Sequence, residues 1–170
     1  MTFLELCMIL LIFAFVKEGI MITRNIEGNI VPLLGKRKAI IIMGARQVGK
    51  STLLQQMLGD RKDVVWMNGD ELDIQELFRE MTSTRIRAIL GNNRFLVIDE
   101  AQRIQDIGLR LKLITDQIPE VQVIATGSSS FELATKVNES LTGRKREFKM
   151  FPLTFGEMVR HRRRQREHHR

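Results

Sequence analysis

The sequence predicts an α/β fold in which a parallel sheet of about five strands is covered by helices. Short, continuous apolar runs alternate along the chain with segments of helical periodicity, as expected when crossover helices connect parallel strands. A glycine-rich loop follows the first apolar run, and a later run ends in two carboxylates. Because ligands bind at the carboxyl ends of the strands in such sheets, we expect both features to lie together at those ends.

Each strand and helix has an expected place in the chain. Apolar runs predict strands at 39–43, 64–68, 95–100, 121–125 and 147–151. A short helix and loop are expected within 22–38, before the first strand. Helical spacing of apolar residues then predicts helices at 50–58, 85–90, 109–119 and 131–141. A further helix is expected to begin at the capping-box pattern Asp73-x-x-Glu76. Ser129-x-x-Glu132 and Thr154-x-x-Glu157 are two further capping boxes, and the latter opens a final helix. Trp66, the only tryptophan, is expected in the core.

Composition favours a single globular domain in a reducing compartment, the cytoplasm. A chain of 170 residues that is 44% apolar can bury one substantial core, and its single cysteine excludes internal disulfides. The net charge is +7, but six arginines and one glutamate in 160–170 supply most of it. This arginine-rich tail has two interpretations: solvated sequence, which a short arginine run favours, and a segment that binds nucleic acid or an anionic surface.

Residues 1–20 form an apolar segment before the predicted globular core at 21–159. The apolar run is about fifteen residues long, shorter than the roughly twenty residues of a membrane-spanning helix. It also lacks the basic start and the cleavage site of a signal peptide. Three interpretations remain: a membrane anchor through residues 1–16, an additional core or partner helix, and non-native sequence upstream of a start at Met21. The ordinary soluble sequence that begins at Met21 favours the third.

The glycine-rich loop is the strongest functional signal. Residues 44–51 read Gly-Ala-Arg-Gln-Val-Gly-Lys-Ser and match the phosphate-binding pattern Gly-x-x-x-x-Gly-Lys-Ser/Thr between a strand and a helix. The glycines allow a tight turn whose backbone N–H groups converge on phosphate oxygens, and the helix adds its positive end. Lys50 is expected to reach the β- and γ-phosphates, and Ser51 to bind Mg²⁺. The predicted nucleotide-binding residues are Gly44, Ala45, Arg46, Gln47, Val48, Gly49, Lys50, Ser51 and Thr52.

Four further residues are candidates for metal binding and catalysis. Asp99 ends an apolar strand, a pattern that delivers a carboxylate to Mg²⁺ beside the loop. Glu100 either polarises a water for attack on the γ-phosphate or is an acidic residue at the start of the next helix. Ser128 follows the fourth strand and either contacts the γ-phosphate or the attacking water, or caps a turn. Arg144 is either a phosphate-binding arginine, in cis or in a neighbouring subunit, or a solvated side chain.

Five motifs in order resemble a prokaryotic ATPase family of the AAA+ superfamily, whose members typically carry a C-terminal nuclease-like domain of unknown function. The motifs lie at 44–54, 99–104, 126–133, 139–144 and 151–157, and the resemblance covers about 21–159. It implies a P-loop NTPase fold with strand order 5-1-4-3-2. It also implies that Lys50 and Ser51 contact phosphate and metal, and that Asp99 binds Mg²⁺. Glu100 would then be the water-activating base and Ser128 a sensor of the γ-phosphate.

The C-terminal sequence departs from this family. After Phe-Pro-Leu-Thr-Phe at 151–155 the chain enters arginine-rich sequence, so we expect the helical lid and the C-terminal domain to be missing, as in a truncated product. The guanine-binding pattern Asn-Lys-x-Asp is absent, which favours ATP. The first prediction is Mg²⁺-dependent ATP hydrolysis. The alternatives are a nucleotide-binding switch or remnant with little hydrolysis, which acts as an interaction module, and a small-molecule kinase. A homo-oligomer fits each of them, and no protein partner is identified.

Overall fold

The computed structural model describes residues 21–128 and 141–168, and the chain forms two units. One unit comprises 26–152, and the other combines residues up to 25 with residues from 153 onward. The apolar segment 1–20 and all but the last residue of the helix predicted at 131–141 lie outside the described residues. In the part of the chain that is described, no helix is long and apolar enough to cross a membrane.

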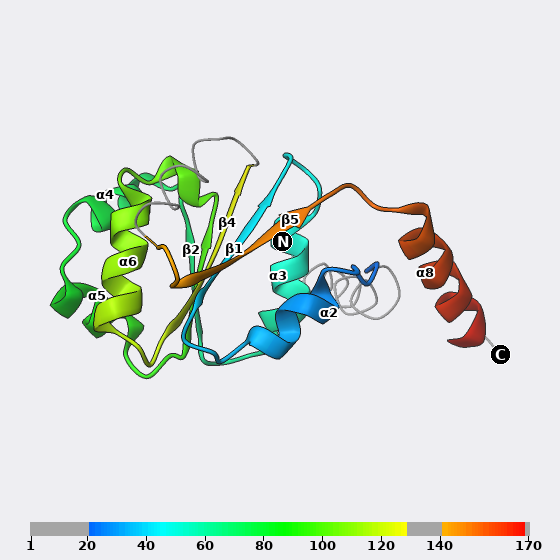
Figure 1. Ribbon diagram of the computed structural model, residues 1–170, viewed down its shortest axis with the longest axis horizontal. Helices are drawn as coiled ribbons and strands as arrows, with labels where there is room; N and C mark the ends of the chain where they lie inside the picture. Colours follow the sequence, from blue (N-terminus) through cyan, green and yellow to red (C-terminus); the bar gives the residue numbers. More distant parts are fainter. Residues whose placement is uncertain (1–20, 129–140, 169–170) are drawn as a thin grey trace, which may run out of the picture. The chain divides into compact units, whose positions relative to one another are not determined.

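The unit 26–152 is built around a five-stranded sheet in the order β2-β3-β4-β1-β5 (Figure 1). All neighbouring strands are parallel. Read from the other edge, this is the predicted order 5-1-4-3-2, so the predicted fold class is confirmed. The strands are β1 (Ala39–Gly44), β2 (Val64–Asn68), β3 (Phe95–Asp99), β4 (Gln122–Ser128) and β5 (Lys145–Met150).

Helices cover both faces of this sheet (Figure 1). On one face lie α2 (Glu27–Ile30) and α3 (Lys50–Leu58). On the other face lie α4 (Leu72–Arg79), α5 (Ser83–Leu90) and α6 (Ile107–Gln117). Two short 3-10 turns complete the connections: η1 (Val31–Leu33) precedes β1, and η2 (Ala101–Arg103) follows β3.

Side chains of β1 alternate between two buried clusters. Ile41 and Met43 belong to the cluster formed with α4, α5 and α6. Ile40 and Ile42 belong to the cluster formed with α2 and α3. Because both faces of the strand are covered, every residue of β1 is buried, and this explains an apolar run without polar alternation.

Two local predictions are wrong. Trp66 is 41% exposed rather than buried, because β2 is an edge strand with no strand on its outer side. Asp73 does not cap α4, since the helix begins at Leu72 and Asp73 lies within its first turn. The carboxylate of Asp73 accepts instead from the neighbouring amide of Ile74 at 3.0 Å. The N-cap is Glu71, whose backbone is extended and whose side chain makes no capping bond.

Gln122 fixes the loop that leads into β1. It is buried at the start of β4, and its Oε1 accepts from the amide of Gly35 at 2.8 Å. Its Nε2 donates to the carbonyl oxygens of Leu33 at 3.0 Å and Lys38 at 2.8 Å, and also to that of Lys36. One buried side chain therefore bonds four backbone groups of the segment 33–38 that leads into β1.

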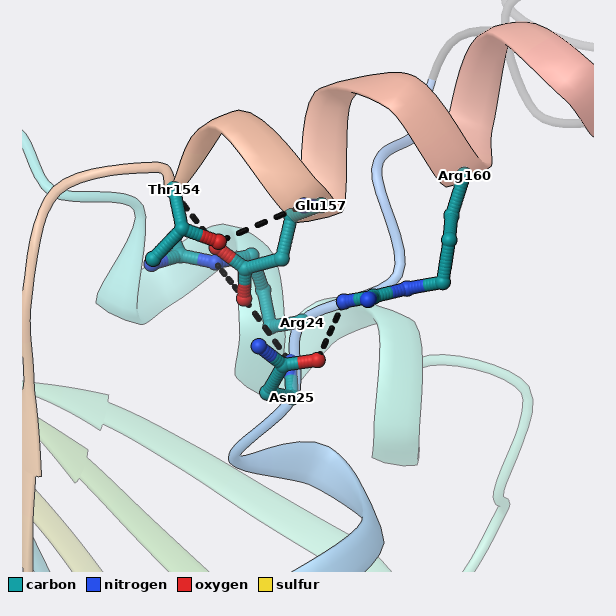
Figure 2. Close-up of polar contacts among 5 residues, drawn as sticks. All are labelled: Arg24, Asn25, Thr154, Glu157 and Arg160. Carbon is teal, nitrogen blue, oxygen red and sulfur yellow. Dashed lines mark hydrogen bonds and ion pairs between the residues drawn. The ribbon is translucent and has the colours of Figure 1, made fainter.

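The second unit contains α8 (Phe155–His168) and the segment 21–25. The predicted capping box at its start is confirmed (Figure 2). The amide of Glu157 donates to Thr154 Oγ1 at 3.2 Å, and the amide of Thr154 donates to Glu157 Oε2 at 2.8 Å. The helix continues through 160–168, so this part of the arginine-rich tail is helical.

The carboxylate of Glu157 also binds the segment 21–25 (Figure 2). Its Oε1 accepts from the amide of Asn25 at 2.8 Å and from Arg24 Nε at 3.2 Å, and both side chains of this ion pair are buried. One turn further along α8, Arg160 donates to the side chain of Asn25. Two segments that are distant in sequence are thereby joined around one buried carboxylate.

Candidate nucleotide-binding site

The glycine-rich loop connects the end of β1 to the start of α3. Gly44 approaches β5 so closely that a Cβ atom there would lie 2.5 Å from the carbonyl oxygen of Met150. Gln47 and Gly49 have positive φ angles of 64° and 93°, which give the tight turn that the motif predicts. Gly49 is the N-cap of α3 and has no side chain to cap it, so the helix presents its first N–H groups to a ligand.

Lys50 places its positive charge inside this loop. Its side chain is buried, and Nζ donates to the carbonyl oxygens of Gly44 at 3.1 Å and Ala45 at 3.0 Å. Phosphate oxygens form stronger, charge-assisted bonds with an ammonium group than neutral carbonyls do. The loop therefore holds its lysine where an incoming phosphate competes favourably for it.

Ser51 and Asp99 bring two oxygen ligands together beside the loop. Ser51 Oγ, in the first turn of α3, donates to Asp99 Oδ2 at the end of β3, with a distance of 2.5 Å. Mg²⁺ prefers such hard oxygen donors and is usually held by one or two protein ligands, phosphates and water. In the described part of the chain no group of three or more His, Cys, Asp or Glu residues forms a metal site. The donors present thus fit a magnesium ion that is shared with a phosphate ligand.

Glu100 follows Asp99 in a left-handed conformation with φ 48°. Its amide donates to Asp99 Oδ1 at 3.1 Å, and its carboxylate accepts from the side chain of Gln102. The backbone of Gly69 packs directly against it: a Cβ atom on Gly69 would lie 2.5 Å from the carbonyl oxygen of Glu100. The amide of Gly69 also donates to the carbonyl oxygen of Asp99 at 2.8 Å, so the end of β2 supports both acidic residues.

The structure brings Ser128 to the loop and leaves Arg144 far from it. Ser128 is the last residue of β4 and pairs in register with Gly44, the first residue of the loop. Arg144 immediately precedes β5 and lies at the amino-terminal ends of the strands, where its carbonyl oxygen accepts from the amide of Ala39. Its side chain pairs with Asp116 at 2.6 Å. The full length of β1 therefore separates Arg144 from the loop of its own chain.

Several residues around the acidic pair were not predicted as site residues. Thr126 Oγ1 donates to Asp99 Oδ1 and accepts from the amide of Glu100, while Gln102 and Gly69 contact Glu100 as described above. A signal for Thr126 exists in the sequence, since it is a hydroxyl within an apolar run that leads to a polar loop. Its partner was not evident, because the register of β3 and β4 appears only in the folded sheet.

Comparison with curated proteins finds relatives of unassigned function. The chain is 28% identical over 147 residues to the uncharacterized protein MJ1544 of Methanocaldococcus jannaschii, an alignment that covers 84% of this chain and 32% of that protein. It is also 28% identical over 122 residues to the uncharacterized protein Rv2008c of Mycobacterium tuberculosis, covering 71% of this chain and 26% of that protein. The chain thus spans about a third of the length of these relatives, or less.

Solved structures share the fold at low sequence identity. The ORC1 protein of Aeropyrum pernix, solved in complex with DNA, matches with a TM-score of 0.63 and 13% identity over 89% of this chain and 51% of that chain. The Walker-type ATPase Paby2304 of Pyrococcus abyssi matches with a TM-score of 0.57 and 18% identity over 85% of this chain and 57% of that chain.

Sequence comparison also identifies the family. Residues 36–159 match the AAA domain family, and this range includes the glycine-rich loop, both acidic residues and all five strands. The parallel sheet, its strand order and the loop between β1 and α3 agree with that assignment. The chain therefore belongs to the AAA domain family of P-loop ATPases, and it contains a nucleotide-binding domain of that family.

Proposed function

We propose that this domain binds ATP together with Mg²⁺ and hydrolyses it to ADP and phosphate. The observation that carries the proposal is the contact between Ser51 and Asp99, which joins the phosphate loop to the acidic end of β3. A phosphate loop alone supports nucleotide binding. A hydroxyl and a carboxylate held together at its helix supply the metal ligands that phosphoryl transfer requires.

Each residue has a distinct role in this mechanism. Lys50 moves its ammonium group from the loop carbonyls to the β- and γ-phosphates, and the N–H groups at the start of α3 bind phosphate oxygens. Ser51 and Asp99 would hold Mg²⁺, which would supply positive charge to neutralise the phosphates. The Glu100 carboxylate polarises the attacking water, and for this it must exchange its contact with Gln102 for that water. Ser128, beside Gly44, contacts the γ-phosphate or the water.

Two variants test this proposal, each with its own control. Lys50→Ala is expected to weaken ATP binding, since it removes the buried cation of the loop. Glu100→Gln is expected to keep binding and to lose turnover by roughly 10²–10⁴-fold, the usual contribution of a general base. Lys62→Ala and Glu80→Gln, both at exposed positions, are matched controls. Binding is measured with a fluorescent ATP analogue and turnover by phosphate release.

The outcomes separate the proposal from its alternatives. A nucleotide-binding switch would bind ATP, but neither wild type nor Glu100→Gln would release phosphate faster than a sample without protein. A small-molecule kinase would release little free phosphate with or without an acceptor, and would form ADP and a phosphorylated acceptor only when the acceptor is added. Equal turnover of wild type and Glu100→Gln would exclude Glu100 as the base, whereas ATP binding that is unchanged by Lys50→Ala would overturn the whole assignment.

Arg144 enters this mechanism only through a neighbouring copy. It lies at the end of β1 remote from the loop, so a contact with the γ-phosphate would come from a second subunit in a homo-oligomer. Mixing two inactive variants tests this: Arg144→Ala keeps the loop, and Lys50→Ala keeps the arginine. Restored turnover in the mixture is the expected result, with Arg146→Ala, an exposed neighbour, as the control. Full activity of Arg144→Ala alone would refute it.

A second candidate function rests on the arginines of α8. Arg160 and Arg164 donate to Asn25 and Thr23, but no contact with another described side chain is found for Arg162, Arg163 and Arg166. Arg166 lies four residues after Arg162 and three after Arg163, spacings that bring side chains to one helical face, so these three cations form a stripe that fits the phosphates of nucleic acid. The binding is independent of ATP hydrolysis.

Duplex DNA with a fluorescent label provides the test of this surface. Replacing all three arginines of the stripe by alanine is expected to reduce the slope of log affinity against log salt by about 2 to 3. Alanine at Arg94 and Arg146, which are exposed outside this helix, is the control. Binding only to phosphatidylserine vesicles would assign the stripe to a lipid surface and refute the nucleic-acid proposal, as would an unchanged slope.

A further inference from the structure

Thr126 contributes a hydroxyl group at the boundary between β4 and the acidic end of β3. It is completely buried, and its hydroxyl contacts Asp99 at the end of the neighbouring strand β3. The hydroxyl of Thr126 donates to Asp99 Oδ1. Its oxygen, Thr126 Oγ1, also accepts from the amide of Glu100 at 3.3 Å. A single side chain thus binds both residues that are proposed to hold the metal and to activate water.

These contacts extend to the phosphate loop. The two oxygens of Asp99 are divided: Oδ2 accepts from Ser51 Oγ, and Oδ1 accepts from Thr126 and from the amide of Glu100. The carboxylate plane is therefore fixed from both sides. Because Thr126 has no exposed surface, its hydroxyl does not reach a nucleotide or a solvent water, and it acts through its neighbours alone.

We propose that Thr126 is a positioning residue that orients Asp99 for Mg²⁺ and fixes the backbone of Glu100. The inference rests on the proposed function and concerns residues that support the metal ligand rather than bind the metal. Hydrogen-bond partners of metal ligands typically contribute 10–100-fold in metal affinity or activity. Without the hydroxyl, the amide of Glu100, at 3.1 Å, is the one donor to Asp99 Oδ1 among the described residues, and the carboxylate can rotate away from Ser51.

Substitution by valine and serine separates the hydroxyl from packing. Thr126→Val keeps the shape of the side chain and removes the hydroxyl, while Thr126→Ser keeps the hydroxyl. Binding of a fluorescent ADP analogue is titrated with Mg²⁺ and repeated in EDTA. The Mg²⁺ concentration for half-maximal binding is expected to rise about tenfold in Thr126→Val and to stay near wild type in Thr126→Ser. Affinity in EDTA is expected to be equal in all three proteins.

Each result is decisive for the role of Thr126. A wild-type midpoint in Thr126→Val, or an equal loss of binding in EDTA, overturns the inference and leaves the proposed function intact. Wild-type protein without Mg²⁺-dependent binding overturns both. If Thr126→Val does not fold, Thr126→Ala gives the same comparison with a smaller side chain. In an Asp99→Asn background the effect of Thr126→Val is expected to disappear, because the partner that it orients is changed.

Discussion

Replacing Glu157 by glutamine tests whether one buried carboxylate stabilises the unit formed by α8 and the segment 21–25. Its side chain is only 4% exposed. Burial raises its pKa, but the amides of Thr154 and Asn25, the hydroxyl of Thr154 and the guanidinium of Arg24 all donate to it and lower the pKa more strongly. The balance lowers the pKa of Glu157 from 4.5 to about 2.

The difference in pKa sets both the size and the pH range of the effect. A shift from 4.5 to about 2 corresponds to about 3 kcal/mol of stability for the ionised form. Because the pKa in the folded state is lowered, this stability is fully present above pH 4.5. It is lost progressively as the pH falls from 4.5 toward 2. Glutamine cannot ionise, so Glu157→Gln lowers the stability at neutral pH and removes this pH dependence.

Hydrogen exchange of the amides in 21–25 and 153–160 measures this directly, after correction for the intrinsic rate at each pH. We expect the opening free energy of wild type to fall by about 3 kcal/mol between pH 5 and pH 2. The Glu157→Gln variant is expected to start lower and to change little over that range. Glu80→Gln, at an exposed position, is the control and should behave as wild type. Parallel curves for wild type and Glu157→Gln would refute the reasoning.

Three further predictions concern close backbone contacts and the buried amide. Gly44→Ala should weaken nucleotide binding and lower stability by about 1–3 kcal/mol, because its Cβ would meet the carbonyl of Met150; a binding titration and thermal melting check this. Gly69→Ala should reduce turnover more than ATP affinity, since its Cβ would displace the backbone of Glu100, and steady-state kinetics beside a binding titration measure this. Gly28→Ala, with open space around its Cβ, is the control for both, and an equal effect there would contradict them. Gln122→Leu should cost about 2–4 kcal/mol in urea unfolding by leaving backbone groups unpaired, whereas Gln117→Leu at an exposed position should be neutral.

The sequence predicts the central part of this fold well, because local patterns and long-range packing agree there. The helix at 50–58 and the strand at 64–68 have the predicted bounds, since glycine and charged residues end each apolar pattern sharply. Strand β1 reads as buried on both faces, and it is. The fourth and fifth strands differ by a few residues at their ends, where strand length depends on the neighbour rather than on the strand itself.

Predictions failed where the answer depends on a neighbouring element. The exposure of Trp66 follows from the edge position of β2, which the composition of the strand does not reveal. Asp73 has the spacing of a capping box, but the helix starts one residue before it. The capping box at Thr154 succeeded because both of its bonds are formed within four residues of the chain.

The candidate site shows the same limit. Motifs predicted the residues of the loop, Asp99 and Ser128 as site residues. The parallel sheet brings them together at the carboxyl ends of its strands. Arg144 was also predicted from its motif, but its position at the amino-terminal ends of the strands follows from the sheet topology. The hydroxyl of Thr126 was overlooked since threonine is also an ordinary strand residue, and only its bond to Asp99 distinguishes it.

The close approach of Gly44 to Met150 brings the first residue of the nucleotide loop into backbone contact with β5. Met150 ends β5, and the chain leaves this unit at Pro152, directly after it. The ladder between β5 and β1, and a backbone contact without an intervening side chain, join the end of β5 to the first residue of the loop. A displacement of the backbone at Met150 would therefore change the position of Gly44, because no side chain lies between them to absorb it.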